Sequence, residues 1–285
     1  MSMFTDFATS LYDSLVLGNS LEKPGNFEHY VLERFPCADA LPTGAVENAD
    51  NLMYPADNDK MLRICTVSDT HNRHYLFTNL PTCDVILHTG DIFMHSRMIS
   101  TSKAIHMLKK FNEWLGTLPA PHKIVIGGNH DKVMEDIGVE AVRAILTNGT
   151  YLCNSSTTVF GVTIWGTPLS HGRSGNAAFQ SAEFETATIE ELRLLEATKQ
   201  HVDILLTHGP CTHIGELAKP RIMHVSGHVH AHHGVRTTHR RDHADGAPRR
   251  QWYRVSAPIM DTKYQPTQLP VLVDVTIPRS KHANS

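Results

Sequence analysis

The segment KIVIGGNHD, Lys123–Asp131, joins a short apolar run to a group of small and polar residues. The run is rich in β-branched residues and has the length of a strand buried on both faces. The two glycines that follow let the backbone turn sharply, so that the next side chains can be directed to one side. The segment therefore predicts a buried strand whose carboxyl end carries functional groups.

Four other segments repeat this design of an apolar run that ends in small and polar residues. They are LRICTV-SDTH from 62, DVILH-TGD from 84, VDILL-THG from 202 and RIMHV-SGHVH from 221. Helical patterns lie between them, at 100–118 and at 188–200, where Thr188 and Glu191 have the spacing of a capping box. Strands that alternate with helices predict an α/β domain.

The strand ends supply two carboxylates, one amide and four imidazoles. In open α/β sheets, sites form at the carboxyl ends of the strands, so we expect these side chains to converge. Seven ligands suit two ions that share a carboxylate better than one ion. The candidate metal ligands are Asp69, His71, Asp91, Asn129, His208, His228 and His230.

The spacing and chemistry of these candidates bear on how they bind a metal. Asp69 and His71, like His228 and His230, are two residues apart, and in an extended segment such pairs point the same way. Mixed nitrogen and oxygen donors favour Mn, Fe, Zn or Co over Mg or Ca. Mn²⁺ is the expected ion, with Fe, Zn, Co or Mg as alternatives.

Composition excludes several classes of protein. The 285 residues are 41% hydrophobic and 19% charged, which is typical of a globular chain. A net charge of −3 gives no general attraction to nucleic acid or to anionic membrane, so a nucleic-acid partner is not expected. No apolar run approaches the roughly 18 to 20 residues of a membrane span. The five widely spaced cysteines favour a reducing compartment, and we expect a cytoplasmic location.

The chain divides into three parts by the pattern of its apolar and polar residues. Residues 1–60 form an N-terminal extension, expected to be helical at 4–16 and irregular from 17 to 60. Residues 61–279 carry the alternating pattern, and 280–285 are a tail. A basic stretch at 236–250 lacks interleaved aromatic residues, so a solvated loop is favoured over a nucleic-acid patch.

The order D-x-H, G-D, G-N-H-D, H-G, G-H-x-H resembles the calcineurin-like metallophosphoesterase superfamily. The matching segments are SDTH, TGD, GGNHD, THGP and SGHVH, and the likeness spans about 61–279. The stretches KKFNEWLGTLPAPHKIVIGGNHD (109–131) and YQPTQLPVLVDV (264–275) are similar to a narrower group, the metallophosphoesterase-domain-containing phosphodiesterases. This resemblance implies an α/β fold, a four-layer αββα sandwich with the metals at the strand ends.

The resemblance also implies how the candidates divide between two ions. Asp69, His71, Asp91 and His230 would hold one ion. Asp91, Asn129, His208 and His228 would hold the other, so that Asp91 is shared. His130 would stand outside this set as the acid or electrophile. The reaction implied is hydrolysis of a phosphate ester by a metal-bridging hydroxide.

Four further residues are candidates for catalysis or substrate binding. His130 follows Asn129 directly and can stabilise or protonate the leaving oxygen. Asp131 either orients that imidazole or caps a helix expected over 132–146. Arg173, in a Gly/Ser-rich loop, could contact the substrate, although an exposed arginine is the favoured interpretation. His232, past the last ligand pair, could line the mouth of the site and face solvent or substrate.

Three functions fit this pattern. The leading hypothesis is a phosphodiesterase acting on a small, nucleotide-type phosphodiester. The alternative is a phosphomonoesterase, including a phosphoprotein phosphatase, because the motifs are common to both. A non-catalytic scaffold is disfavoured, since all seven ligand candidates and His130 are present. The sequence identifies no protein partner.

Overall fold

A computed structural model describes residues 28–32, 60–77, 80–94, 98–172, 175–237 and 252–277. The expected helix at 4–16, the tail at 280–285 and residues 238–250 of the basic stretch lie outside the described residues. The boundaries drawn at 60 and 279 therefore stay predictions.

The first sheet carries three of the predicted strands side by side. Its order is β1-β12-β2-β3-β4-β5, and β2, β3 and β4 run parallel. The strands are β1 (Glu28–Leu32), β2 (Lys60–Val67), β3 (Val85–Thr89), β4 (His122–Ile126), β5 (Thr150–Tyr151) and β12 (Val271–Ile277). Parallel pairing brings the carboxyl ends of β2, β3 and β4 to the same edge.

The second sheet holds the other two predicted strands. Its order is β10-β11-β9-β8-β7-β6, and β7, β8 and β9 run parallel. The strands are β6 (Ser155–Val159), β7 (Val162–Thr167), β8 (Ile204–Thr207), β9 (Met223–Ser226), β10 (Gly234–Thr237) and β11 (Tyr253–Ser256). Every residue of β3, β8 and β9 is buried, as expected for strands covered on both faces.

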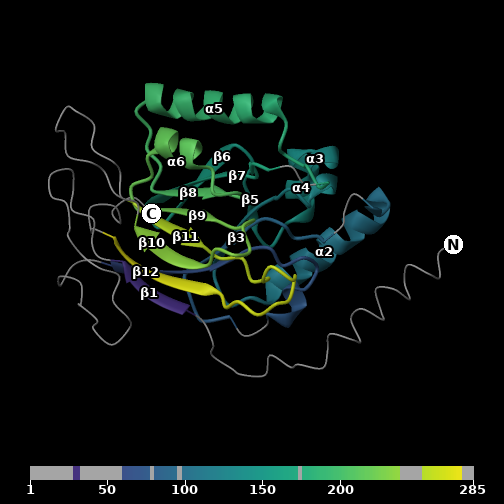
Figure 1. The fold of residues 1–285 in the computed structure, drawn as a ribbon. Helices are drawn as coiled ribbons and strands as arrows, with labels where there is room; N and C mark the ends of the chain where they lie inside the picture. The colour runs from purple at the N-terminus through teal and green to yellow at the C-terminus, as the bar shows by residue number, and fades with distance from the viewer. Residues whose placement is uncertain are drawn as a thin grey trace.

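Helices cover the outer face of each sheet (Figure 1). The elements are η1 (His74–Leu76), α2 (Thr101–Thr117), α3 (Lys132–Ile137), α4 (Val139–Ile145), α5 (Ala182–Ala197) and α6 (Thr212–Ala218). α2, α3 and α4 pack on the first sheet, whereas α5 and α6 pack on the second. The predicted α/β fold, a four-layer αββα sandwich, is confirmed.

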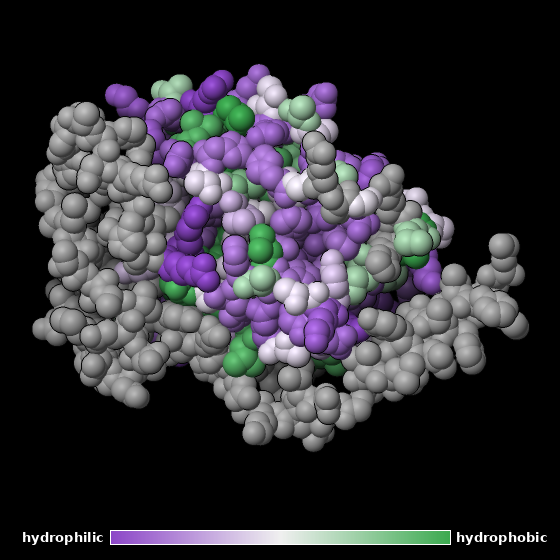
Figure 2. Space-filling model, viewed as in Figure 1, coloured by the Kyte–Doolittle hydropathy of each residue, from purple (hydrophilic) through white to green (hydrophobic). Residues whose placement is uncertain are grey.

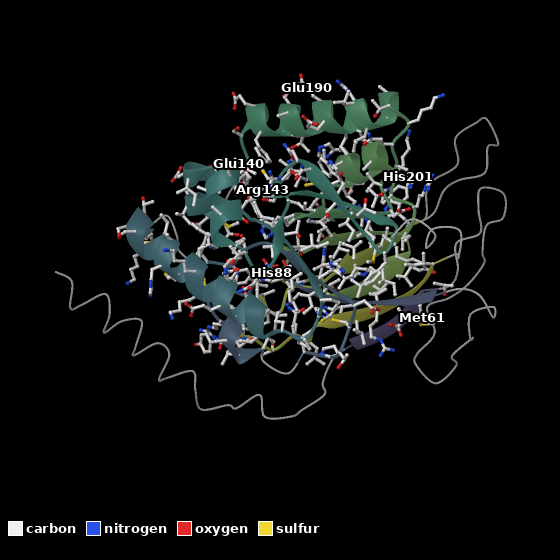
Figure 3. All side chains as sticks on the ribbon, turned by 180° about the vertical axis from the view of Figure 1, so that it is seen from behind. Met61, His88, Glu140, Arg143, Glu190 and His201 are labelled. Carbon is white, nitrogen blue, oxygen red and sulfur yellow. The ribbon has the colours of Figure 1, made fainter. Side chains whose placement is uncertain are left out.

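One apolar core lies between the two sheets. Alternate residues of each strand contribute to it, such as Leu62 and Ile64 of β2 and Met223 and Val225 of β9. The intervening residues face the helices. His88 of β3 is one of them: it is fully buried and its ring lies 5.0 Å from that of Phe111 on α2 (Figure 3). The sandwich follows from this alternation, because each strand has apolar partners on both sides.

Three local expectations were wrong. Residues 28–32 are not irregular but form β1, which pairs in parallel with β12. The helix expected from 188 begins at Ala182, where the Ser181 side chain accepts a hydrogen bond from the Phe184 N–H. Thr188 is thus no cap: it lies buried inside α5 and donates to the carbonyl of Phe184. The helix expected over 132–146 is broken at residue 138 into α3 and α4.

The surface shown in Figure 2 is mostly hydrophilic, with hydrophobic residues in small separate groups. Scattered apolar residues of this kind are normal on a protein surface. Among the described residues, none of the helices combines the length and the apolar character needed to cross a bilayer.

Candidate functional site

The five predicted strand ends meet at one edge of the sandwich. Within the first sheet, the Asp69 N–H donates to the Gly90 carbonyl at 2.9 Å, and within the second the Gly227 N–H donates to the His208 carbonyl at 2.9 Å. Between the sheets, the His228 N–H donates to the Asp69 carboxylate at 3.0 Å. Backbone hydrogen bonds thus join the loops within each sheet, and the Asp69 carboxylate joins the loops of the two sheets.

All seven candidate ligands come together at this edge. Five of them are buried: Asp69, His71, Asp91, Asn129 and His208. His228 and His230 are partly exposed and so border the solvent. Charged and polar groups this deeply buried require partners, because an unpaired buried ion is strongly disfavoured.

The backbone at four candidates is strained rather than extended. Asp69, His71, Asp91 and His228 have φ of 55°, 44°, 53° and 66°. Each pair two residues apart was expected to converge because its segment is extended. The pairs do converge, but the segments are not extended. The side chains converge because left-handed turns direct them, and such strained residues cluster at functional sites.

Two glycines make room for the candidate carboxylates. A Cβ at Gly128 would overlap the Asp91 carboxylate, and one at Gly227 would overlap that of Asp69. Only a residue without a side chain fits at these two positions, which explains the glycines that precede Asn129 and His228 in the sequence.

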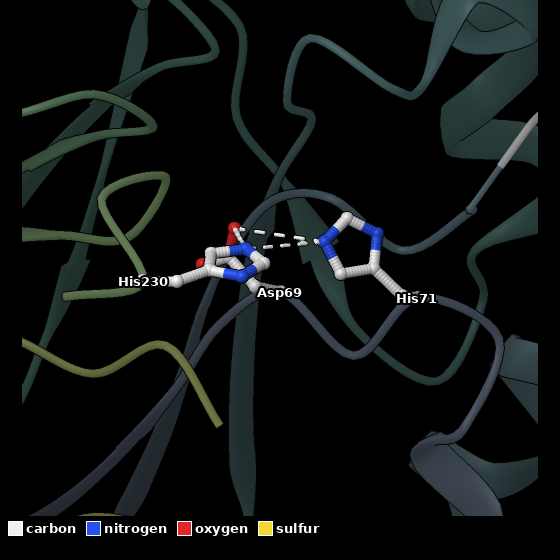
Figure 4. Close-up of side chains that lie close together, drawn as sticks. All are labelled: Asp69, His71 and His230. Carbon is white, nitrogen blue, oxygen red and sulfur yellow. Dashed lines mark hydrogen bonds and ion pairs between the residues drawn. The ribbon is translucent and has the colours of Figure 1, made fainter. Parts of the chain in front are cut away.

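A first group consists of Asp69, His71 and His230 (Figure 4). The His230 Nε2 lies 3.3 Å from Asp69 Oδ1, and the His71 Nε2 lies 4.0 Å from the same oxygen. The two Nε2 atoms are 3.3 Å apart. Asp91 Oδ2 borders this group, 3.8 Å from the His71 Nε2.

A second group consists of Asp91, Asn129, His208 and His228. The Asn129 Oδ1 lies 3.0 Å from the His208 Nε2 and 2.9 Å from the His228 Nδ1. Asp91 Oδ1 is 3.2 Å from the same His208 nitrogen. Asp91 therefore faces both groups, one oxygen toward each.

Each of the four candidate histidines has one ring nitrogen that points away from its group, and this nitrogen hydrogen-bonds to a backbone carbonyl. The accepting carbonyls belong to Phe93 for His71, Thr89 for His208, His171 for His228 and Asp261 for His230, at 2.8–3.1 Å. A carbonyl can only accept, so that ring nitrogen must carry the proton. In a neutral ring the nitrogen that faces the group then presents a lone pair, as in metal-binding histidines.

Each group is consequently a set of acceptors that face one another without donors. In the first, two imidazole lone pairs meet a carboxylate oxygen. In the second, the Asn129 amide N–H₂ donates to the Asn176 carbonyl at 2.8 Å, which leaves its oxygen facing two more lone pairs. Acceptors at these distances repel unless a cation lies among them. The donor set thus fits two metal ions, and its mixed nitrogen and oxygen atoms suit a transition metal.

The pKa shifts of the side chains show that positive charge is favoured between them. Burial raises the pKa of Asp91, but His208, His130 and His71 outweigh it and hold that pKa below its usual value. Burial lowers the pKa of His208, but the Asp91 and Asp69 carboxylates raise it to about 9. The carboxylates therefore attract a proton where a cation would otherwise bind.

A model of the calcineurin-like phosphoesterase family matches residues 62–233, more than half of the chain. The matched range begins in β2 and ends just past the last histidine pair, so it contains all seven candidates. The chain belongs to the calcineurin-like phosphoesterase family.

Similar proteins agree with this assignment. Metallophosphoesterase domain-containing protein 1 of Homo sapiens is 32% identical over 76% of this chain and 72% of its own length, and the Mus musculus protein gives the same values. A UPF0046 protein of Caenorhabditis elegans is 27% identical over 80% of this chain and 85% of its own. This calcineurin-like phosphoesterase is thus a metal-dependent phosphoric ester hydrolase.

His130 lies beside both groups, at the edge of the first. Its Nδ1 donates to the carbonyl of Met94, and its Nε2 is 3.8 Å from Asp91 Oδ2 and 3.4 Å from the Asn176 amide nitrogen. Its donor atom is also within reach of His71 and Asp91, so geometry alone would permit it to bind a metal. Its role stays a prediction.

Asp131 is the N-cap residue of α3 by position, but its side chain makes no capping hydrogen bond. Its carboxylate instead accepts from the backbone N–H groups of Gly128, Ile92 and Phe93 at 2.8, 3.2 and 3.0 Å. Burial, together with the charge of Asp91, raises its pKa to about 7. Asp131 thus ties the loop after β4 to the loop after β3, and its catalytic role stays a prediction.

Of the two candidate substrate contacts, only His232 lies among the described residues. Arg173 lies outside the described residues. His232 is exposed, and with His233, Arg236 and Arg254 it lines a hollow of about 290 Å³ over β9, β10 and β11. This hollow includes none of the seven candidate ligands.

His224 of β9, at the buried side of this hollow, is a histidine that packs in the second sheet. It is 2% exposed, its Nε2 lies 2.6 Å from the Thr207 hydroxyl, and burial lowers its pKa to about 3. Its neutral ring donates to Thr207, whose own proton goes to the Gly209 carbonyl. The expectation of a packed ring that binds no metal agrees with these contacts.

His224→Ala is expected to lower the free energy of unfolding by about 2–4 kcal/mol, because it leaves a cavity and an unmatched hydroxyl. Metal content should not change. Since the folded pKa is depressed, the wild type takes up a proton on unfolding and loses stability as pH falls from about 6.5 to about 3. Urea titrations across this range should show a shallower loss in the variant; loss of metal would contradict the assignment.

Two residues of the site were missed by the sequence analysis. Asn176 contacts Asn129 and His130, and the Tyr264 ring lies 5.1 and 4.8 Å from those of His71 and His230. Tyr264 opens a stretch that carries the family likeness, which was the available signal. Asn176 lies in a Gly/Ser-rich loop with no such signal.

Proposed function

We propose that this phosphoesterase is a phosphodiesterase that hydrolyses small, nucleotide-type phosphodiesters with two Mn²⁺ ions. The observation that carries the metal requirement is the pair of acceptor-only groups joined by Asp91. In this proposal Asp69, His71, Asp91 and His230 hold one ion, and Asp91, Asn129, His208 and His228 hold the other.

The two ions supply a field that attracts the phosphoryl group and lowers the pKa of a water molecule. The side chains around the centre supply the proton transfer. The Met94 carbonyl fixes the tautomer of His130, so its Nε2 is the atom that holds or gives up a proton beside the site. In the imidazolium form, this nitrogen can donate to the leaving oxygen as the ester bond breaks.

The likeness of residues 109–131 and 264–275 to a phosphodiesterase group supports a diester as substrate. The described side chains beside the centre include His130, Asn176 and Tyr264, none of which carries a fixed positive charge. A monoester dianion gains most from bidentate guanidinium groups, whereas a diester carries one negative charge.

We expect hydrolysis of bis(p-nitrophenyl) phosphate to exceed that of p-nitrophenyl phosphate in kcat/KM with Mn²⁺. EDTA should abolish both activities, and Mn²⁺ should restore them better than Mg²⁺ or Zn²⁺. Protein with the Asp91→Asn substitution, purified in parallel, controls for contaminating phosphatases. A clear monoester preference would instead identify a phosphomonoesterase, and no metal-dependent turnover of either ester would favour a scaffold.

A further inference from the structure

A second cluster of metal-ligating side chains lies outside the candidate dinuclear site. His171 is in the loop after β7, Glu185 is in the first turn of α5, and His213 is in the first turn of α6. The Glu185 Oε1 lies 2.8 Å from the His213 Nε2 and 3.7 Å from the His171 Nε2. The two imidazole rings are 4.8 Å apart, and all three side chains are between 33% and 47% exposed.

We propose that His171, Glu185 and His213 form a third metal site, which takes a zinc-like cation and fastens the loop after β7 to α5 and α6. Two imidazoles and a carboxylate are a set that zinc binds, with water in the fourth position. Tetrahedral zinc bonds of about 2.0–2.1 Å place ligand atoms roughly 3.3 Å apart. The two nitrogen–oxygen distances lie on either side of that value, so small rotations of exposed side chains complete the site.

The backbone holds the three side chains in position. The His171 carbonyl accepts from the His228 ring, the Gly209 N–H donates to the Leu169 carbonyl at 3.1 Å, and Ser181 caps α5. The loop that bears His171 and the segment that leads into α6 are therefore already joined. A preorganised set of donors loses less conformational entropy when it binds an ion.

The position of this site links it to the dinuclear centre. The same loop contacts His228 through the His171 carbonyl and Asn129 through the Asn176 carbonyl. A cation bound at His171 would hold the carbonyl that orients His228. The third site is thus separate in its ligands but shares one loop with the centre, which gives it the means to regulate turnover.

The test counts zinc in full-length protein that is stripped of metal and then dialysed against micromolar Zn²⁺. Wild type should bind one ion more than Glu185→Gln and one more than His213→Ala. His106→Ala, which removes an exposed histidine of α2, should match wild type. Zinc should also slow amide hydrogen exchange in residues 168–177 of wild type more than in Glu185→Gln.

The difference of one ion does not depend on how many ions the dinuclear centre holds, so failure of either assignment is recognisable. Equal zinc content in wild type and both variants would overturn the proposal. A loss of more than one ion in either variant would also overturn it, because these residues would then support the dinuclear centre instead of forming a site of their own.

Discussion

Asp91→Asn is expected to reduce metal content at both positions of the dinuclear centre and to lower kcat by at least ~10³-fold. Asp91 is the one candidate ligand that presents an oxygen to each group, 3.2 Å from the His208 Nε2 and 3.8 Å from the His71 Nε2. An amide offers only one acceptor and no charge. The measurement is elemental analysis of Mn-reconstituted protein, together with turnover of the aryl diester.

Asp136→Asn is the matched control, because Asp136 is an exposed carboxylate on α3 that pairs with Lys132. It should keep about two ions and full activity. The His130 N–H donates to Asp91 Oδ1 at 2.9 Å, so a folding check by circular dichroism belongs with the comparison. Full metal content and full activity in a folded Asp91→Asn protein would contradict a centre bridged by this residue.

His130→Ala is expected to keep both ions and to lose roughly 10²- to 10⁴-fold in kcat on phosphodiesters with a poor leaving group, such as phenyl or alkyl esters. The dependence on the leaving group makes the test specific. If His130 donates a proton to the leaving oxygen, the loss should be small for a p-nitrophenyl ester and larger for a phenyl or alkyl ester. Turnover of such a series, with His106→Ala as the control, measures this directly.

Loss of metal from His130→Ala would have a different meaning. The His130 ring lies near His71 and Asp91, in an arrangement that could itself hold an ion. A variant that loses one ion would therefore show His130 to be a ligand. A uniform loss across the leaving-group series, with metal retained, would assign it to stabilisation of the phosphoryl oxygens instead.

The strand ends were predictable because a buried apolar run changes abruptly to small and polar residues at each of them. Runs such as VDILL can only be buried, and His208 follows at once, so the sheet itself determines where that side chain lies. β1 was not predictable in the same way, because its place depends on backbone pairing with β12, more than 230 residues later.

The chemistry within the site was less accessible to the sequence. Which nitrogen of His230 faces the group depends on the Asp261 carbonyl, 31 residues farther along the chain. Asp131 was placed next to His130 by sequence, yet its carboxylate points to three backbone N–H groups instead. The His171 cluster joins residues up to 42 positions apart, with no local spacing to reveal it.

The edge where the two sheets meet has a consequence for how the molecule denatures. Asp69, Asp91 and Asn129 follow strands of one sheet, whereas His208 and His228 follow strands of the other. Separating the sheets must pull these groups apart. A ligand bound only to the native state adds to the free energy of unfolding with the logarithm of its concentration. The melting temperature of this protein should therefore depend on the concentration of free metal ion as well as on the polypeptide.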